Sequence, residues 1–209
     1  MAELINAMMN SDINALKKVM KRHGYTELHF AIMECNINKI RKLLDKGANP
    51  NARNETGMTP LHYATKDCPE AIPILIKYGA DPHARDEGGM TPLHYAALHG
   101  GLNAAEALIK HSDVNARDKD GRTPLHLALE YGHCNVALLL IGSGADVNVA
   151  DKNGVRPINY AVEKKRCYEV AKLLLERGAD PTIPDARGRT PLDAARLGCS
   201  ELAELLSGK

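Results

Sequence analysis

The sequence contains no tryptophan and one phenylalanine, and aromatic residues make up 4% of its 209 residues. A core with so few rings must be built from Leu, Ile, Val and Ala, which favours closely packed helices over one large globular core. An excess of charge of either sign is also absent, since the sequence has 27 Lys plus Arg and 26 Asp plus Glu, which gives a formal net charge of +1. Without a basic excess or a basic tail, electrostatic binding to nucleic acid or to a membrane surface is not expected.

Long apolar runs and a secretory leader are absent as well. The longest apolar stretches, such as residues 136–141, are far shorter than the ~20 residues of a bilayer-spanning helix. The chain opens with Met1, Ala2 and Glu3 and lacks a basic segment followed by an apolar one. We therefore expect the mature chain to begin here and to reside in the cytoplasm.

A four-residue segment recurs through the chain. The five steps between its six copies are 33, 32, 32, 33 and 34 residues. The copies are TELH at 26–29, TPLH at 59–62, 91–94 and 123–126, RPIN at 156–159, and TPLD at 190–193. A fixed period of this length is typical of a solenoid whose units stack in a line.

Each unit also carries an apolar triad spaced i, i+3, i+4, which places three side chains on one helical face. The triads are Ile40, Leu43, Leu44; Ile72, Leu75, Ile76; Ala105, Leu108, Ile109; Ala137, Leu140, Ile141; Ala171, Leu174, Leu175; and Leu202, Leu205, Leu206. Thr followed by Pro is a helix-start signal, and glycine suits the position just beyond a helix end. The sequence therefore predicts two helices per unit, with polar turns between units.

A period of about 33 residues with TPLHxA and GADxN resembles the ankyrin repeat over essentially the whole chain. The resemblance implies an all-α solenoid of helix-turn-helix units with β-turn or hairpin fingers between them. We expect a single domain, residues 1–209, whose units lean on their neighbours and need adapted ends. Its expected parts are an N-terminal cap at 1–24, repeats at 25–53, 54–85, 86–117, 118–150 and 151–184, and a C-terminal capping repeat at 185–209.

Histidine and cysteine recur at matching places, which could suggest a metal site. In the ankyrin family the histidine of TPLH hydrogen-bonds within its own turn, and this implies the same role for His29, His62, His94 and His126. Neighbouring helices lie ~8–10 Å apart, too far for a shared zinc ion or for a disulfide. The cysteines are thus predicted to be reduced and unpaired, at Cys35, Cys68, Cys134, Cys167 and Cys199. No metal and no cofactor is expected.

Catalytic motifs are absent from the sequence. It contains no GxSxG elbow and no CxxC pair, and the GSG at 142–144 lacks a following lysine and closes a helix. We therefore expect no enzymatic activity. The basic residues 164–166 have two interpretations, a site for an acidic partner or phosphate and a solvated turn.

Three units depart from the pattern. Unit five replaces Thr and His with Arg156 and Asn159, and losing the cap costs ~1 kcal/mol, so we expect this unit to be among the least stable. In unit two, Pro69 and Pro73 lie near the start of the second helix. A helix that starts beyond Pro69 avoids most of the ~3 kcal/mol cost of an interior proline. Unit three ends its second helix with residues 111–113 in place of Gly-Ala-Asp, which predicts a different turn.

The resemblance implies protein binding on the concave face, made by the finger tips and the exposed sides of the first helices. The apolar residues that vary there, beside a polar anchor at Arg122, are the expected contacts. The full predicted set is Met58, Lys66, Met90, Leu98, His99, Arg122, Glu130 and Tyr131. An alternative for Met58 and Met90 is that they only pack on adjacent fingers.

The resulting hypothesis is a non-catalytic module, monomeric when free, that binds another protein and inhibits it or holds it in an assembly. A second hypothesis is an ankyrin-type effector or substrate adaptor of an intracellular bacterium, secreted into a host cell and acting on a host protein. The sequence names neither the partner nor the pathway, because a fold does not identify a partner.

Overall fold

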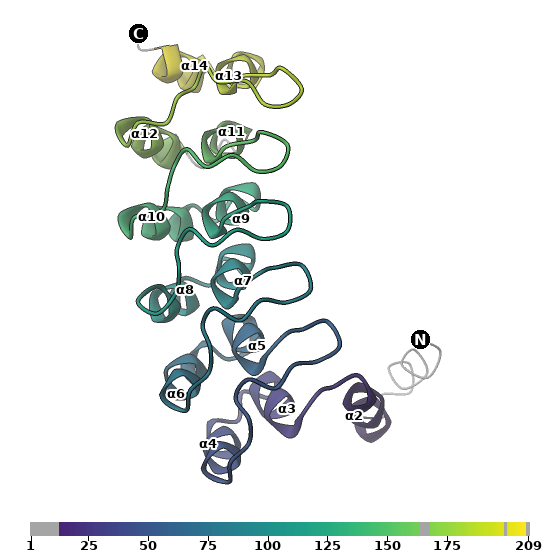
Figure 1. The fold of residues 1–209 in the computed structure, drawn as a ribbon. Helices are drawn as coiled ribbons and strands as arrows, with labels where there is room; N and C mark the ends of the chain where they lie inside the picture. Colours follow the sequence, from purple (N-terminus) through teal and green to yellow (C-terminus); the bar gives the residue numbers. More distant parts are fainter. Residues whose placement is uncertain (1–12, 164–167, 199, 208–209) are drawn as a thin grey trace.

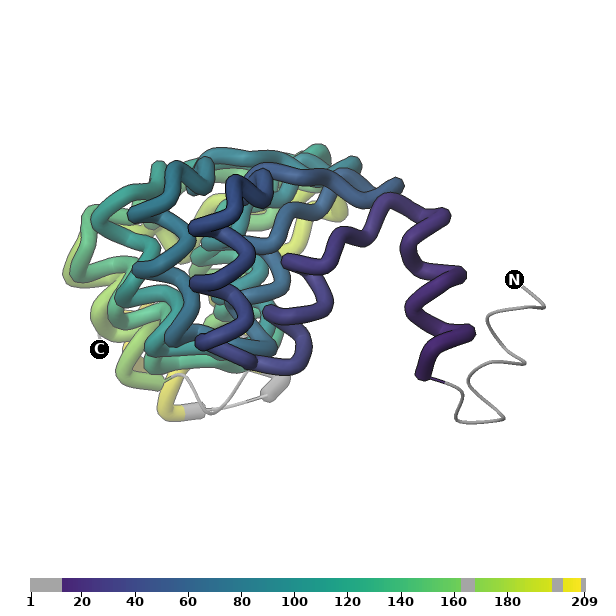
Figure 2. The backbone as a smooth tube through the Cα atoms, turned by 90° about the horizontal axis from the view of Figure 1, so that it is seen from below, coloured from purple at the N-terminus to yellow at the C-terminus, as the bar shows by residue number. Residues whose placement is uncertain are grey.

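The computed structural model describes residues 13–163, 168–198 and 200–207, and in these ranges every regular element is a helix. The helices stack as antiparallel pairs (Figures 1 and 2). The first helices are α3 (Glu27–Met33), α5 (Pro60–Asp67), α7 (Pro92–His99), α9 (Pro124–Glu130), α11 (Pro157–Glu163) and α13 (Pro191–Gly198). The second helices are α4 (Ile37–Asp45), α6 (Ile72–Lys77), α8 (Leu102–Ile109), α10 (Cys134–Gly142), α12 (Tyr168–Glu176) and α14 (Ser200–Ser207).

The stack curves so that the first helices and the loops between units line its concave side (Figure 1). One continuous core, built almost entirely of Leu, Ile, Val and Ala, runs along it from Leu28 to Leu206. Phe30 is also buried, on the first of the paired helices. The expected all-α ankyrin solenoid is confirmed. The predictions for Cys167, Cys199, residues 164–166 and the first half of the N-terminal cap lie outside the described residues.

The Thr-Pro segments start the first helices as predicted. Thr59 is extended, with φ −99° and ψ 166°, and Pro60 opens α5. The backbone N–H of Thr59 donates to Nδ1 of His62 over 3.0 Å, so the ring closes the turn that contains it. The same bond, from the first residue of the segment to the histidine three positions later, recurs at His29, His94 and His126.

The second nitrogen of each ring reaches the next unit, a contact that the sequence did not predict. His94 Nε2 lies 3.1 Å from the carbonyl oxygen of Arg122, and the other three rings make equivalent contacts. A carbonyl can only accept, so Nε2 carries the hydrogen and Nδ1 accepts. Each imidazole therefore ties the start of its own helix to the finger that follows.

The fingers are the loops that precede each Thr-Pro segment, and backbone hydrogen bonds link them into a row. Glu87 N–H donates to the Thr56 carbonyl over 2.9 Å, and Lys119 N–H donates to the Gly88 carbonyl over 2.8 Å. Two further links of this kind join the later fingers. Gly89 has φ +77°, and a Cβ there would lie 3.0 Å from Lys119 N, so this approach requires glycine.

Helix ends follow the glycine pattern. Gly47, Gly79, Gly144 and Gly178 all have positive φ after their second helices. The junction of unit three takes a different turn, as predicted, because neither His111 nor Ser112 has a positive φ. The Ser112 hydroxyl is buried there without a hydrogen-bond partner. In unit two, a short 3₁₀ helix η1 (Pro69–Ala71) precedes α6, and Pro73 falls in the first turn of α6, where its cost is small.

The helix α2 (Ile13–Arg22) does not continue the row of second helices. It lies on the first-helix side of the stack, beside α3, in both views (Figures 1 and 2). Ion pairs hold it there, with Lys17 2.5 Å from Glu34 and Lys21 2.6 Å from Glu27. Capping by the N-terminal segment and the repeat boundaries stay predictions.

The prediction that every cysteine is unpaired was wrong. Cys134 is disulfide-bonded, and Cys35 and Cys68 form a disulfide with their Cα atoms 5.0 Å apart. The expected spacing applies to helix axes, whereas both cysteines lie in inter-helix turns. Cys35 follows the end of α3 in a left-handed conformation, with φ 44°, and Cys68 follows α5 directly. Turns can approach one another more closely than the helices that they join.

Candidate protein-binding face

The eight residues predicted to bind a partner all lie on the first helices, on the fingers or just after a first helix. Lys66, His99 and Tyr131 are exposed, at the ends of α5, α7 and α9. The other five are half-buried, and they are Met58, Met90, Leu98, Arg122 and Glu130. The structure divides this set into a depression, an ion-pair network, two side chains that pack inward and one exposed ring, Tyr131.

A depression of about 190 Å³ lies between α5, α7 and the finger that leads into α5. It brings together three of the predicted residues, Met58, Lys66 and His99. The remaining lining side chains are His62, Tyr63, Asp67 and Tyr95. The Tyr95 hydroxyl donates to Asp86 Oδ2 over 2.8 Å and lies 3.6 Å from Met58 Sδ, which fixes one wall of the depression.

The electrostatics of the depression are set by burial. Partial burial of the ring lowers the pKa of His99 from its ordinary value of 6.5, and the charge of Lys66 lowers it in the same direction. Burial raises the pKa of Asp67 from its usual range. The result is an aromatic and thioether floor with a lysine ammonium at its exposed rim, a combination that suits an apolar side chain next to an acidic one.

The predicted polar anchor, Arg122, is engaged within the chain. Its guanidinium lies 3.0 Å from Asp118 Oδ2, 3.5 Å from Asp120 and 3.4 Å from Glu130. The Asp118 side chain is 1% exposed, so this arm of the network is buried. Arg122 and Glu130 are therefore brought together, and they offer a partner a paired charge instead of a free cation.

Met90 and Leu98 pack against the core with part of each side chain. For Met90 this contact is with the core, so packing on an adjacent finger stays a prediction, and half-burial leaves part of each side chain open. Tyr131 differs, because 54% of it is exposed at the end of α9. It is one of three exposed large apolar residues in the described ranges, with Ile13 and Leu138.

The tyrosines that line the depression were not predicted from the sequence. The ring of Tyr63 packs edge-on against His29, with centroids 5.6 Å apart, and Tyr95 packs likewise on His62 at 5.4 Å. Each tyrosine thus contacts the histidine of the preceding unit. The available signal was the duplicated string GMTPLHYA, in which the tyrosine follows the histidine directly.

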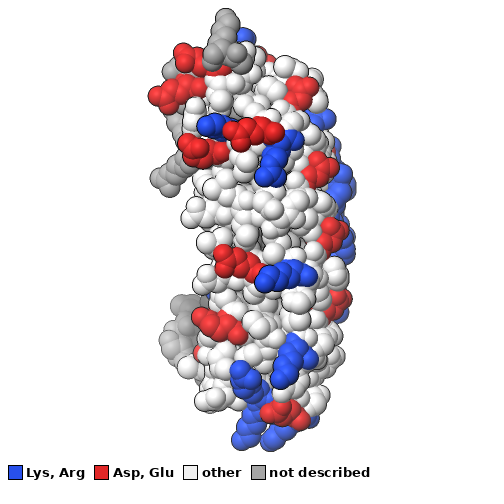
Figure 3. Space-filling model, turned by 90° about the vertical axis from the view of Figure 1, so that its left-hand side faces the viewer, with Lys and Arg blue, Asp and Glu red and all other residues white. Residues whose placement is uncertain are grey.

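The second-helix side is a different surface. Figure 3 shows an uncharged stretch on this side, with charged side chains above it, below it and along one edge. The helix α10 has the sequence CNVALLLIG, without a charged residue, and its Leu138 is 37% exposed. This face was not predicted as a binding surface, although the sequence of α10 contains no charged residue.

A second depression, of about 290 Å³, lies between α11, α13 and the finger that leads into α13. Asn159 lines it, at the position where four other units carry histidine. The side-chain amide oxygen Oδ1 of Asn159 accepts from Arg156 N–H over 2.9 Å, which replaces the inner bond of the imidazole. The shorter side chain does not fill the space that an imidazole would occupy.

The recurring histidines are structural in this arrangement. Burial lowers the pKa of His29 and His94 to about 4, and it lowers the pKa of His62 and His126 in the same direction. Both ring nitrogens of each are committed to hydrogen bonds. A neutral ring bonded on both sides has no lone pair left for a metal ion or a proton transfer.

No helix within the described residues has the length and apolar character needed to span a bilayer.

Comparison with known proteins assigns the repeats to a family. Models described as ankyrin repeats match residues 1–86, 67–151 and 138–195. A putative ankyrin repeat protein of Fowlpox virus is 41% identical over 59 residues, which cover 28% of this chain and 42% of that protein. The mitochondrial disaggregase of Homo sapiens is 45% identical over 51 residues, covering 24% of this chain and 7% of that protein. The chain spans less than half the length of these relatives.

Proposed function

The chain belongs to the ankyrin-repeat family, and we propose that it is a non-catalytic module that binds a partner protein on its concave face. Ankyrin repeats generally mediate protein–protein interactions and are generally not catalytic. The proposal goes further by assigning the contact to particular units, since fold alone does not locate a partner.

The observation that carries the proposal is the depression that joins Met58, Lys66 and His99. Its walls come from two successive first helices and one finger, so the stacking of units creates it. Pockets that accept one anchoring side chain are common centres of protein interfaces. An apolar or aromatic anchor with a neighbouring carboxylate fits the floor and the lysine rim.

Tyr131 extends this surface toward the middle of the stack. Tyrosine is enriched among the residues that dominate interface energies, because it combines a large apolar area with a hydroxyl. Its exposure of 54% leaves the ring available without any rearrangement of the core. The paired charges of Arg122 and Glu130 lie between the depression and this ring in sequence and serve as a polar rim.

The test is affinity capture from the cells that make the protein, with three baits that keep the core intact. The wild type is compared with a Lys66→Glu, Tyr131→Ala double variant and with Leu138→Ala. Leu138 is the matched control, because it is also an exposed apolar residue but lies on α10, a second helix. Circular dichroism of each bait verifies that the helices are retained.

A partner that binds wild type and Leu138→Ala should bind the double variant at least tenfold more weakly, which corresponds to ~1.4 kcal/mol. Loss of binding with Leu138→Ala alone would move the interface to the second-helix side and refute the concave assignment. Equal binding to all three baits would refute the role of the depression and of Tyr131.

A further inference from the structure

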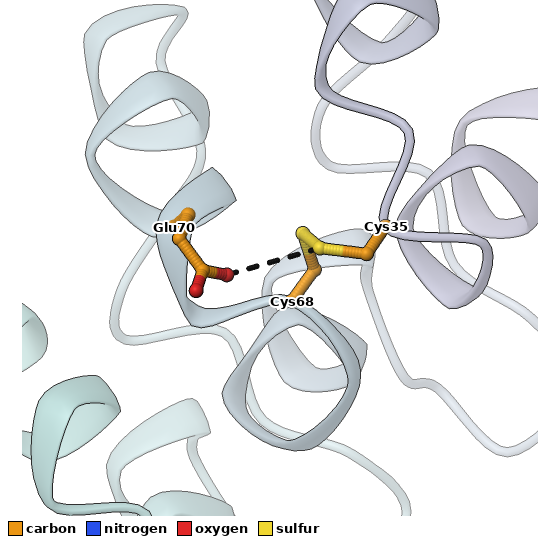
Figure 4. Close-up of side chains that lie close together, drawn as sticks. All are labelled: Cys35, Cys68 and Glu70. Atoms are coloured by element: carbon orange, nitrogen blue, oxygen red, sulfur yellow. Dashed lines mark hydrogen bonds between the residues drawn. A yellow bond between two sulfur atoms is a disulfide. The ribbon is translucent and has the colours of Figure 1, made fainter.

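Cys35, Cys68 and Glu70 lie together where the inter-helix turns of units one and two meet (Figure 4). Cys35 follows α3, whereas Cys68 and Glu70 flank Pro69 at the start of η1. In the described part of the chain, no other group of three His, Cys, Asp or Glu side chains has ligand atoms this close together. All three ligand atoms lie within 4.8 Å of one another.

The distances fit the coordination of zinc. Zinc binds cysteine sulfur at ~2.3 Å and carboxylate oxygen at ~2.1 Å in tetrahedral geometry, which places a sulfur and an oxygen ligand ~3.6 Å apart. Glu70 Oε2 lies 3.8 Å from Cys35 Sγ. A disulfide sulfur has no hydrogen to donate, so this contact is no hydrogen bond in the oxidised protein. One sulfur–oxygen edge of the tetrahedron is thus already in place.

The surroundings allow an ion to enter. Cys35 and Glu70 are exposed, and Cys68 is buried, so the cluster opens to solvent on one side and rests on the core on the other. Glu70 forms no ion pair with a Lys, Arg or His side chain among the described residues. Its carboxylate is therefore available as a ligand without the loss of an existing pair.

We propose that reduction of the Cys35–Cys68 disulfide creates a zinc site, with the two thiolates and the Glu70 carboxylate as ligands and water in the fourth position. A dithiol reductant supplies two electrons and two protons. The S–S bond breaks, two thiols form, and the reductant becomes a cyclic disulfide. The incoming Zn²⁺ displaces the two thiol protons to solvent as the two Zn–S bonds form.

The consequence is a link between units one and two in either redox state. A disulfide joins the turns under oxidising conditions, and the zinc ion joins the same turns under reducing conditions. In a linear stack, each unit is stabilised by its contacts with its neighbours. A cross-link between adjacent units therefore opposes the local separation of these two units.

The test uses the full chain, reduced with a phosphine, freed of reductant without oxygen and titrated with Zn²⁺. Bound zinc is measured by mass spectrometry of the metal, and Co²⁺ serves as a spectroscopic probe through its thiolate charge-transfer absorption. Variants Cys35→Ser and Glu70→Gln are compared with Glu106→Gln, an exposed glutamate on α8 that serves as the matched control. Cys134, Cys167 and Cys199 stay in every variant, so metal that they bind cancels in the comparison.

Reduced wild type and Glu106→Gln should each bind one more zinc ion than Cys35→Ser. Glu70→Gln keeps both sulfurs, and it should bind this ion at least tenfold more weakly and change the Co²⁺ spectrum. The oxidised wild type should lack this ion. Equal zinc content in reduced wild type and Cys35→Ser would overturn the site, and wild-type affinity in Glu70→Gln would remove the carboxylate from it. The helical circular dichroism of each variant is measured as well, and a spectrum like that of wild type excludes unfolding as the cause of a change in zinc binding.

Discussion

Lowering the pH from about 7.5 to about 5 should destabilise the stack through its buried imidazoles. The rings of His29 and His94 are neutral, and each accepts a backbone N–H at Nδ1. Protonation would place a hydrogen on the nitrogen that already accepts one, and would bury a charge. Burial is the main cause of the lowered pKa in both rings.

The direction follows from proton binding by the two states. The ordinary pKa of the ring is 6.5, and that of the folded His29 and His94 is about 4. Between these values the unfolded chain binds protons that the folded chain does not bind, so stability falls as pH falls. The full stability is present above the unfolded pKa, and the loss is complete below the folded one. Most carboxylates contribute mainly at lower pH, because their ordinary pKa values are 3.8 and 4.5. Asp67, whose pKa burial raises, acts in the opposite direction, because its folded form binds the proton more readily.

The magnitude is large compared with the stability of a small domain. At about pH 5, each ring is ~1.5 pH units below its unfolded pKa, and at ~1.36 kcal/mol per unit this costs about 2 kcal/mol. His29 and His94 together then cost about 4 kcal/mol, and His62 and His126 add to it in the same direction. Typical domains have ~5–15 kcal/mol in total.

Urea unfolding followed by circular dichroism at a series of pH values measures this loss. Variant His94→Asn imitates the natural Asn159 of unit five, and it should reduce the pH-dependent loss by about 2 kcal/mol while lowering stability at neutral pH. His83→Asn is the control, because His83 is exposed in a finger, and its pH dependence should match that of wild type.

Two results would refute this prediction: wild type that keeps its neutral-pH stability at about pH 5, or a His94→Asn variant that loses as much stability as wild type. A direct check is the NMR titration of the ring protons. A folded-state pKa of His94 near 6.5 would contradict the burial argument even if the unfolding data agreed with it.

Three further substitutions test the packing by thermal unfolding. Gly89→Ala should lower the melting temperature more than Gly188→Ala. In both variants alanine must adopt a positive φ, which costs ~1–2 kcal/mol, but only at Gly89 would the new Cβ also lie 3.0 Å from a neighbouring atom. Equal decreases in melting temperature would refute the close approach of the fingers. Ser112→Ala should stabilise by about 1 kcal/mol, since it removes a buried hydroxyl without a partner, and destabilisation would indicate a missed bond. Asn159→His should stabilise by about 1 kcal/mol, because the ring fills the second depression and bonds the next finger, and no gain would show that the space cannot hold it.

Local features were predictable because their causes lie within a few residues. A threonine followed by proline fixes the start of α5, and glycine fixes the turn after α4 at Gly47, whatever the rest of the chain does. The triad residues Ile40 and Leu44 are buried, since helical spacing alone puts them on one face. The hydrogen bond between the His62 ring and the Thr59 N–H was predicted from the family resemblance.

The candidate site was predictable only in part. Repeat positions indicated the first helices and fingers, and with them Met58, Lys66 and His99. They could not show that Arg122 is committed to Asp118, because that contact depends on the conformation of a finger. Tyr95 was missed for a related reason, since its role arises from the unit before it.

The sequence by itself determined the repeat period, the signals that start and end the helices, and which face of each helix is apolar. The tertiary structure alone decided what the units do to one another. The imidazole bonds to the next finger, the row of fingers, the depression and the Cys35–Cys68 disulfide all join residues about one repeat apart. Their geometry depends on the offset and rotation between neighbouring units, which no single repeat encodes, because these arise from packing along the whole stack.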